Sequence, residues 1–374
     1  MDTIHFRRHL HRHPELSFEE HRTAAFIAEV LTEAGIHFEP IARTGILARI
    51  EGSKTTPETA RRALILRADI DALPIEEQTA LPYASENRGV MHACGHDMHA
   101  AALYGTLCAL QQNPDFAGVV FGLFQPGEEL NPGGASLVLA EEPFADYEVI
   151  ACIGEHVDWQ LEVGQIGLHA GPFMASSDEL RFRVGGKGGH GAMRHLITDP
   201  VAATATLITS LLALNEEGVT LSVGKIAAEG ATNVIPDEVY LEGTLRTFDE
   251  QRRQVLHRTI EELIAKNDTL HGTTTQLDLS HGYPAVCNDA ALTELARTLA
   301  TSLGFAPCDL ERRMTAEDFG FYTLRYPSLF YRLGVGKASG RSHTPHFAPD
   351  ESALAVGEKL FTTLVYTLLN DEER

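Results

Sequence analysis

Residues 63–74 read Ala-Leu-Ile-Leu-Arg-Ala-Asp-Ile-Asp-Ala-Leu-Pro, an apolar run that gives way to two aspartates and a proline. A short, continuous apolar run of this kind predicts a strand that is buried on both faces of a parallel sheet. Residues 119–124 and 149–153 have the same character, and helical spacing of apolar residues occupies 20–34 and 100–110. Strands that alternate with helices predict an α/β domain with a mostly parallel central sheet flanked by helices.

The pattern changes between residues 177 and 284, where strands alternate polar and apolar residues as half-exposed antiparallel strands do. The predicted order there is β-α-β-β-α-β, at residues 179–184, 200–214, 221–227, 238–248, 251–266 and 274–279. This order is the ferredoxin-like split pattern. We therefore predict a discontinuous catalytic domain of residues 1–176 and 285–374, interrupted by an inserted ferredoxin-like α+β domain of residues 177–284.

Charge and cysteine content restrict the expected partners and compartment. The chain has 30 Lys and Arg against 52 Asp and Glu, a net charge of −22. Such a surface repels phosphate backbones and anionic lipids, so nucleic acid and membranes are not expected partners. Five cysteines are a sparse, odd set, and the N-terminus lacks the apolar core of a signal peptide. These features favour the reducing cytoplasm.

The densest group of chemically active side chains is His92-Ala-Cys-Gly-His-Asp-Met-His99. Thiolate and imidazole are good ligands for a divalent metal of borderline softness. A turn at the glycine between Cys94 and His96 would aim both side chains at one point. The segment therefore predicts a metal site, whereas a lone cysteine or histidine would predict only a core or surface residue.

Carboxylates follow two of the predicted buried strands. Asp69 and Asp71 end the first strand, and Glu128 and Glu129 follow the tight turn after residues 119–124. Ligands bind outside the carboxyl ends of strands in open α/β sheets. Asp71 is the stronger candidate for orienting a histidine ligand, although a solvated turn ahead of the proline is the alternative. One glutamate can bind metal while its neighbour acts as a general base, and a charged loop is the alternative.

Two further segments add histidines of the kind that bind metals. Residues 154–158 read Gly-Glu-His-Val-Asp after a predicted strand, and residues 342–350 contain His343 and His346. Each histidine alone is a weak signal, but the repetition of ligand-type side chains at strand ends strengthens the prediction of a metal centre. Spacing alone leaves the choice between His343 and His346 open.

These motifs, in this order, resemble the M20 metallopeptidase family, in its amidohydrolase branch of hippurate hydrolases, N-acyl-amino-acid deacylases and N-acetyl-diaminopimelate deacetylases. The resemblance covers essentially the whole chain. The pairing of Cys-Gly-His-Asp-x-His with Gly-Glu-Glu is its most specific part. The matching segments are His9-Leu-His-Arg-His-Pro-Glu15, residues 67–74, residues 92–99, Phe124-Gln-Pro-Gly-Glu-Glu129, Gly186-Lys-Gly-Gly-His190, Asn233-Val-Ile-Pro236, residues 243–249, Glu317-Asp-Phe319 and His343-Thr-Pro-His-Phe347.

The resemblance implies two divalent metal ions, which are manganese, zinc, cobalt or nickel in different members. It selects His343 over His346 because His343 directly precedes Thr-Pro, and it makes Glu128 the catalytic base. Cys94 is expected to bridge the two ions. The implied ligands are Cys94, His96, Glu129, His156 and His343.

The resemblance also gives the inserted domain a role, as a lid and as the surface of a homodimer or higher homo-oligomer. His190 matches a residue that stabilises the oxyanion, often in the partner subunit. Asn233 and Arg246 match positions that contact the α-carboxylate of the substrate, and an arginine can bind a carboxylate bidentately.

The sequence departs from the family pattern at several positions, of which two bear on chemistry. Glu155 stands where leucine is usual, and we expect it to add negative charge near the metals. Arg194 stands in a segment that commonly has proline, at the expected rim of the substrate site. None of the departures removes an implied ligand.

The predicted function is hydrolysis of the amide bond of N-acyl-amino acids of acetyl, benzoyl or arylacetyl type. Water activated by the metals would lose its proton to Glu128. A dipeptidase or aminoacylase of the same family is the alternative within enzymes. A catalytically silent metal- or ligand-binding homologue is the alternative outside them, but the presence of Glu128 and His190 argues against it.

Overall fold

The computed structural model describes residues 1–371 of the chain, which form two compact units. The first unit comprises Met1–Phe173, Cys287–Glu311 and the residues from Asp318 onward. The second unit comprises Met174–Val286 together with Arg312–Glu317. No helix among the described residues is both long and apolar enough to cross a membrane.

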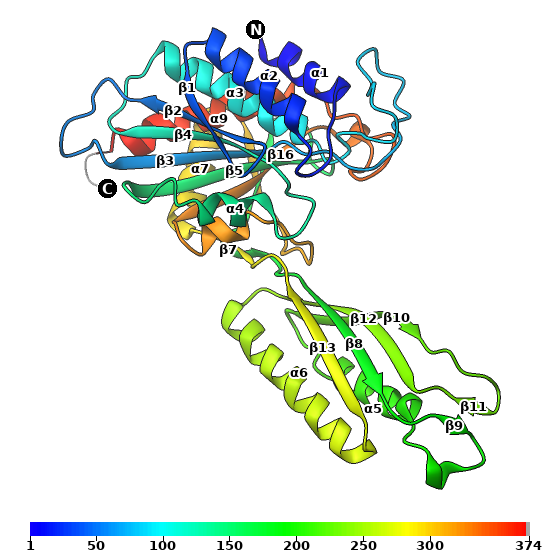
Figure 1. Cartoon of the computed structure of the whole chain (residues 1–374). Coiled ribbons are helices and arrows are strands. Elements are labelled where there is room, and N and C mark those ends of the chain that lie inside the picture. Colours follow the sequence, from blue (N-terminus) through cyan, green and yellow to red (C-terminus); the bar gives the residue numbers. More distant parts are fainter. Residues whose placement is uncertain (372–374) are drawn as a thin grey trace. The chain divides into compact units, whose positions relative to one another are not determined.

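The first unit is built on one eight-stranded mixed sheet (Figure 1). Its central strands β4, β3, β5 and β16 pair in parallel, whereas β1 with β2, β2 with β4, and β16 with β6 pair antiparallel. The parallel centre and the flanking helices confirm the predicted α/β class, and the antiparallel pairs make the sheet mixed. In spatial order the strands are β1 (His37–Ile41), β2 (Gly45–Glu51), β4 (Val119–Gln125), β3 (Arg62–Asp69), β5 (Glu148–Asp158), β16 (Ser328–Gly334), β6 (Gln165–Leu168) and β15 (Ala306–Asp309).

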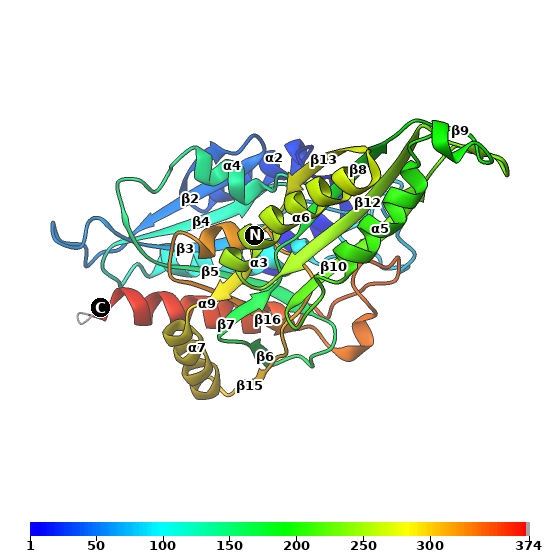
Figure 2. The same ribbon diagram turned by 90° about the horizontal axis from the view of Figure 1, so that it is seen from below.

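Helices cover this sheet on both faces. In Figure 1, α1, α2 and α3 lie on one side of the sheet and α4 lies on the other. Helix α3 packs between α1 and α9, and α7 packs beside α9 (Figure 2). The helices of this unit are α1 (Thr3–Arg12), α2 (His21–Glu33), α3 (His96–Gln112), α4 (Gly134–Ala140), α7 (Ala290–Ser302), α8 (Gly320–Thr323), the 3₁₀ turn η2 (Lys337–Ser339) and α9 (Ala353–Leu369).

Burial explains why the apolar runs form the inner strands. Every residue of β4 is buried, and so is every residue of β3 after Arg62. Burying one aliphatic side chain contributes about 1.5–3 kcal/mol, so such a run is stable only where helices cover both faces. The strand predicted at residues 63–68 is therefore correct, and it ends where Asp69 begins the polar segment.

Two predicted boundaries were wrong at places that bear on function. Helix α3 begins at His96 rather than at residue 100, because its first turn is polar and hides the helical spacing. Strand β5 continues to Asp158 rather than ending at residue 153, because it stays paired with β16 up to that residue. His156 therefore lies within a strand and not in a loop.

The second unit has the predicted order β8-α5-β10-β12-α6-β13 and an antiparallel sheet in the order β10-β12-β8-β13. Helices α5 and α6 pack together, and their apolar residues share one core with the sheet. The elements are β8 (Asp178–Gly185), β9 (Gly189–His190), η1 (Arg194–Leu196), α5 (Pro200–Leu212), β10 (Val219–Ala227), β11 (Val234–Ile235), β12 (Glu238–Thr247), α6 (Glu250–His271) and β13 (Thr274–His281). Strands β7 (Gly171–Met174) and β14 (Val286–Asn288) pair where the chain passes between the units.

Candidate metal centre

The turn between Cys94 and His96 aims both side chains at one region, as the glycine between them predicts. Gly95 has φ +90°, a left-handed conformation that glycine adopts without strain. A Cβ at this position would lie 2.5 Å from Cγ2 of Val157, so the close approach of β5 also requires glycine. His96 is then the first residue of α3.

The five candidate ligands lie together in the first unit. The Cys94 Sγ atom is 3.4 Å from His156 Nε2 and 3.3 Å from His343 Nε2. His343 Nε2 is also 3.4 Å from Glu129 Oε1. Donor atoms of Cys94, His96 and His156 lie within 4.8 Å of one another, and so do those of Cys94, Glu129 and His343. Because Cys94 belongs to both groups, its sulfur stands where two ions could share it.

Hydrogen bonds orient the imidazoles of His96 and His156 so that their Nε2 atoms can bind a metal ion. His96 Nδ1 donates to the backbone oxygen of Asp71 at 2.9 Å, and His156 Nδ1 donates to that of Val157 at 2.7 Å. A carbonyl only accepts, so Nδ1 carries a proton in each ring, and Nε2 is the nitrogen that can bind an ion. His96 Nε2 is buried and makes no hydrogen bond with any residue that the structure describes. A buried imidazole nitrogen without a hydrogen-bond partner among these residues suits a metal ion.

The charges of the centre also fit a cation. Burial, and then the neighbouring Glu129, raise the pKa of the Cys94 thiol well above its usual value. Burial, and then Arg332, hold the pKa of His156 well below its usual value, so this ring is neutral. The thiolate therefore forms when a positive ion offsets its charge, as a bound divalent metal does.

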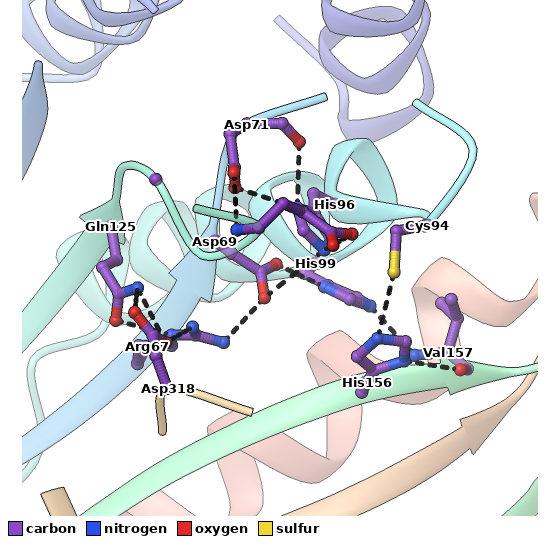
Figure 3. Close-up of polar contacts among 12 residues, drawn as sticks. Arg67, Asp69, Asp71, Cys94, His96, His99, Gln125, His156, Val157 and Asp318 are labelled. Carbon is purple, nitrogen blue, oxygen red and sulfur yellow. Dashed lines mark hydrogen bonds and ion pairs between the residues drawn. The ribbon is translucent and has the colours of Figure 1, made fainter. Parts of the chain in front are cut away.

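Asp71 lies behind two of the candidate ligands, which supports the orienting role over the solvated turn. It is almost fully buried, and its Oδ1 lies 3.2 Å from His96 Nδ1 (Figure 3). Its Oδ2 accepts hydrogen bonds from the Glu129 N–H at 2.9 Å and from Ser17 Oγ at 2.7 Å. Burial alone would raise the pKa of Asp71, but these contacts hold it below its usual value. One carboxylate thereby fixes both His96 and the backbone of Glu129.

Glu128 is buried beside the same cluster, with a carboxylate oxygen within 4.8 Å of donor atoms of His96 and Glu129. The turn before it uses Gly127 with φ +61°, where a Cβ would meet the ring of Phe18 at 2.3 Å. The glutamates after β4 are therefore part of the centre and not a solvated loop.

The C-terminal loop contributes His343 and not His346 to the cluster. The His343 N–H donates to the backbone oxygen of Ala93 at 2.8 Å, which ties the loop to the cysteine segment. His343 has φ +59°, an uncommon conformation for a residue other than glycine. His346 Nδ1 instead donates to the backbone oxygen of Gln78 at 3.1 Å.

The three candidate residues of the inserted region belong to the second unit. His190 is exposed and pairs with Val234 across β9 and β11, and the next N–H, that of Gly191, donates to the Asn233 oxygen at 2.9 Å. His190 and Asn233 are thus neighbours. Arg246 lies on β12, and its Nη1 donates to the Met314 oxygen at 3.0 Å.

The expectation that Glu155 adds charge near the metals was wrong. Successive side chains of a strand point to opposite faces, so Glu155 points away from the side that His156 occupies. Its Oε2 accepts a hydrogen bond from the Tyr331 hydroxyl at 2.6 Å, and its carboxylate lies against Gly357 of α9. Burial raises the pKa of Glu155 to about 8, so the group is mostly neutral at pH 7.

A buried hydrogen-bond network at α1 was not predicted from the sequence. Arg7 Nε donates to Asp97 Oδ2 at 2.7 Å, and His11 Nδ1 donates to the same oxygen at 2.9 Å. All three side chains are fully buried. They secure the first turn of α3, which carries His96. Residues 9–15 were part of the family resemblance, but spacing in the sequence offered no signal for a contact with α3.

Known proteins share both the fold and the motifs of this chain. The model of the peptidase family M20/M25/M40 matches residues 65–367. An N-acetyl-L-cysteine deacetylase of Bacillus subtilis is 38% identical over 99% of this chain and 89% of its own length. An N-acyl-L-amino acid amidohydrolase of Geobacillus stearothermophilus is 40% identical over 77% of this chain and 78% of its own length.

A solved structure extends this similarity to three dimensions. It is a Bacillus subtilis protein described as a dinuclear metal-binding peptidase from the M20 family. It superimposes with a TM-score of 0.86 at 35% identity, over 98% of this chain and 97% of that protein.

Proposed function

The chain belongs to the peptidase family M20/M25/M40 and is a metallo-amidohydrolase, and from this premise we propose that it hydrolyses the amide bond of N-acyl-amino acids. The acyl group we propose is of acetyl, benzoyl or arylacetyl type. The named activities of the deacetylase and amidohydrolase relatives support this substrate class.

The observation that carries the proposal is the placement of Glu128 beside the donor cluster. A buried carboxylate that is not needed as a ligand can act as a base, while Glu129 serves the ion. We propose that Cys94, His96, Glu129, His156 and His343 hold two divalent ions, of manganese, zinc, cobalt or nickel. The dinuclear description of the solved relative supports the number two.

When bound, the ions supply Lewis acidity, which lowers the pKa of water and polarises an amide carbonyl. Glu128 takes the proton of the attacking water and later delivers it to the leaving nitrogen. Asp71 holds the His96 ring and the Glu129 backbone in place during these steps. The chain thus separates the proton transfer, at Glu128, from the orientation of the ligands.

The inserted domain is proposed to supply substrate contacts. His190 would donate a hydrogen bond to the carbonyl oxygen as it gains negative charge. Arg246 and Asn233 would bind the α-carboxylate of the substrate, and the bidentate geometry of a guanidinium suits that group. Support for these roles comes from their side-chain chemistry and from their match to the family motifs.

A Glu128→Gln variant tests the proposal. The amide keeps the size of the side chain but cannot accept the proton, so we expect kcat for N-acetyl- and N-benzoyl-amino acids to fall on the order of 10³-fold. Metal content, measured by elemental analysis, should stay at two ions per chain. Glu129→Gln is the matched variant, and it should lose metal as well as activity.

The same measurements distinguish the alternatives. Normal hydrolysis by Glu128→Gln would refute the mechanism. Wild-type protein that carries two ions but cleaves no member of an acyl-amino-acid panel would favour a silent homologue, and preferential cleavage of dipeptides would favour a dipeptidase.

We further propose that the protein is a homodimer formed through the inserted domain of residues 177–284 and that it works in the cytoplasm. Strand β10 lies at the edge of the four-stranded sheet, and Ile226 on it is 60% exposed. An exposed edge strand with apolar side chains favours pairing with another chain. All five cysteines are free thiols, as suits a reducing compartment. A monomeric mass in sedimentation analysis would refute the dimer.

A further inference from the structure

His99 is one of two histidines of the cysteine segment, with His92, whose role the proposed function leaves open. It lies three residues after His96 on α3, so both rings project from one face of the helix. The His99 ring is fully buried, and its centre lies 5.5 Å from that of His96 and 4.8 Å from that of His156. Together with Asp69 and His96, it also forms a group with donor atoms close enough to hold an ion. Position alone would make it a further ligand.

The contacts of the His99 ring give it a different role. Its Nε2 accepts a hydrogen bond from the Val157 N–H at 2.9 Å. A backbone N–H only donates, so the lone pair of Nε2 is occupied and Nδ1 carries the proton. Nδ1 donates that proton to Asp69 Oδ1 at 2.6 Å (Figure 3). The ring is therefore neutral and has no lone pair left for a metal.

Val157 connects His99 to a candidate ligand. While its N–H is held by His99, its carbonyl accepts the Nδ1 proton of His156 at 2.7 Å. This second contact leaves the His156 Nε2 lone pair facing the Cys94 sulfur at 3.4 Å. The peptide geometry at Val157 thus decides where the His156 ring points.

Asp69, which accepts the Nδ1 proton of His99, is itself fixed by hydrogen bonds. Asp69 is fully buried, and its Oδ2 accepts a hydrogen bond from Arg67 Nη1 at 2.7 Å. Arg67 in turn donates to Gln125 at 2.9 Å and to Asp318 at 2.6 Å. Two strands and the segment at Asp318 therefore fix the carboxylate that orients His99.

We propose that His99 is a positioning residue that sets the His156 ring through the backbone of Val157. The order of contacts is Arg67, Asp69, His99, Val157, His156, as Figure 3 shows. The inference rests on the proposed function, because the ion is what a correctly placed His156 binds. In many metal sites a carboxylate accepts a hydrogen bond directly from a ligand histidine. Here the contact from Asp69 to His156 runs through His99 and the backbone of Val157.

Two substitutions separate the two hydrogen bonds of His99. In His99→Gln, the side-chain oxygen can reach the position of Nε2 and accept the Val157 N–H. In His99→Asn, the amide nitrogen can replace Nδ1 as a donor to Asp69, but no acceptor reaches Val157. Metal-free wild type and both variants would be titrated with Co²⁺, with calorimetry for affinity and stoichiometry and visible absorption for the thiolate and imidazole ligands.

We expect His99→Asn to lower the binding affinity for one of the two ions by about 10–100-fold. This is the range for loss of a hydrogen bond that orients a metal ligand. The affected ion is that of Cys94, His96 and His156, while the ion of Cys94, Glu129 and His343 keeps its affinity. His99→Gln should bind both ions within a few-fold of wild type and keep the wild-type Co²⁺ spectrum.

Three outcomes would overturn the inference. The first is that His99→Asn binds both ions with the affinity of the wild type. The second is that metal affinity falls equally in His99→Asn and His99→Gln. The third is that both variants lose both ions and that their metal-free forms show an equal fall in melting temperature. The wild type serves as the separate test of the proposed function, since binding of fewer than two ions by the wild type would refute the dinuclear centre itself.

Discussion

We compare two clusters of side chains, one in each unit, whose donor atoms lie close enough together to hold a metal ion. One contains Cys94, His96 and His156, and the other contains Asp178, His257 and His281. They differ in what the donor atoms already contact. Asp178 accepts hydrogen bonds from Arg253 at 2.9 Å and 2.5 Å and from His257 at 2.6 Å. His96 Nε2, in contrast, is buried and makes no hydrogen bond within residues 1–371.

The two clusters therefore differ in whether the donor atoms are already occupied by hydrogen bonds within the chain. In the second unit, Arg253 supplies the positive charge from within the chain, and the Asp178 carboxylate also accepts from the Gly282 N–H. Burial would raise the pKa of Asp178, but hydrogen bonds from Arg253 and His257 hold it down, at about 2. In the first cluster, no arginine or lysine among the described residues forms an ion pair or hydrogen bond with the Cys94 sulfur, which instead lies 3.4 Å from His156 Nε2 and 3.3 Å from His343 Nε2.

The largest effect that the comparison predicts is from Cys94→Ala. Removing the sulfur shared by both groups of donors should release metal and lower kcat/KM by more than the roughly 100-fold that loss of an outer contact causes. Metal content by elemental analysis and hydrolysis of an N-acyl-amino acid would be measured together. Cys287→Ser, at an exposed thiol outside the cluster, is the control and should behave as wild type. Full metal content in Cys94→Ala would contradict the proposal that both ions need the Cys94 sulfur.

A smaller effect, on stability alone, is expected from Asp178→Asn. The change removes the fully buried carboxylate that pairs with Arg253, and Arg253 keeps only its ion pair with the less buried Glu250. Breaking a buried ion pair costs about 3 kcal/mol. The midpoint of thermal unfolding should fall by roughly 6–12 °C. Metal content should be unchanged, because Arg253 already fills this cluster.

The matched control for this variant is Glu242→Gln, which breaks the exposed ion pair with Lys225 on the same sheet. Exposed pairs contribute little, so its unfolding midpoint should equal that of the wild type. A fall in metal content in Asp178→Asn would mean that the second cluster also holds an ion.

The smallest predicted effect is the pH dependence of the Asp178 contribution. Its pKa is lowered on folding, from 3.8 to about 2, so its stabilisation is complete above pH 3.8 and is lost as the pH falls toward 2. The shift corresponds to about 2 kcal/mol. The difference in unfolding midpoint between wild type and Asp178→Asn should therefore shrink between pH 6 and pH 3. A difference that grows on acidification would contradict the ion-pair assignment.

The sequence predicted the elements best where burial follows a simple pattern. The strands predicted at residues 63–68 and 119–124 match β3 and β4 to within a residue at each end, and the order of the elements in the second unit is as expected. The first turn of α3 and the end of β5 were missed because polar site residues interrupt the apolar pattern there. The short strands β9 and β11 were also missed, since two-residue strands leave no periodic signal.

The sequence by itself determined the kinds of donor, their order along the chain and the family, because these depend on residue type and local spacing. Only the tertiary structure decided which donors keep an open lone pair. His96 and His99 look alike in the sequence, but His99 is occupied by the N–H of Val157, which is 58 residues away. Glu155 and His156 are neighbours, but the pleat of β5 and the hydroxyl of Tyr331 separate them. The availability of a lone pair depends on contacts between distant segments, and those contacts exist only in the folded chain.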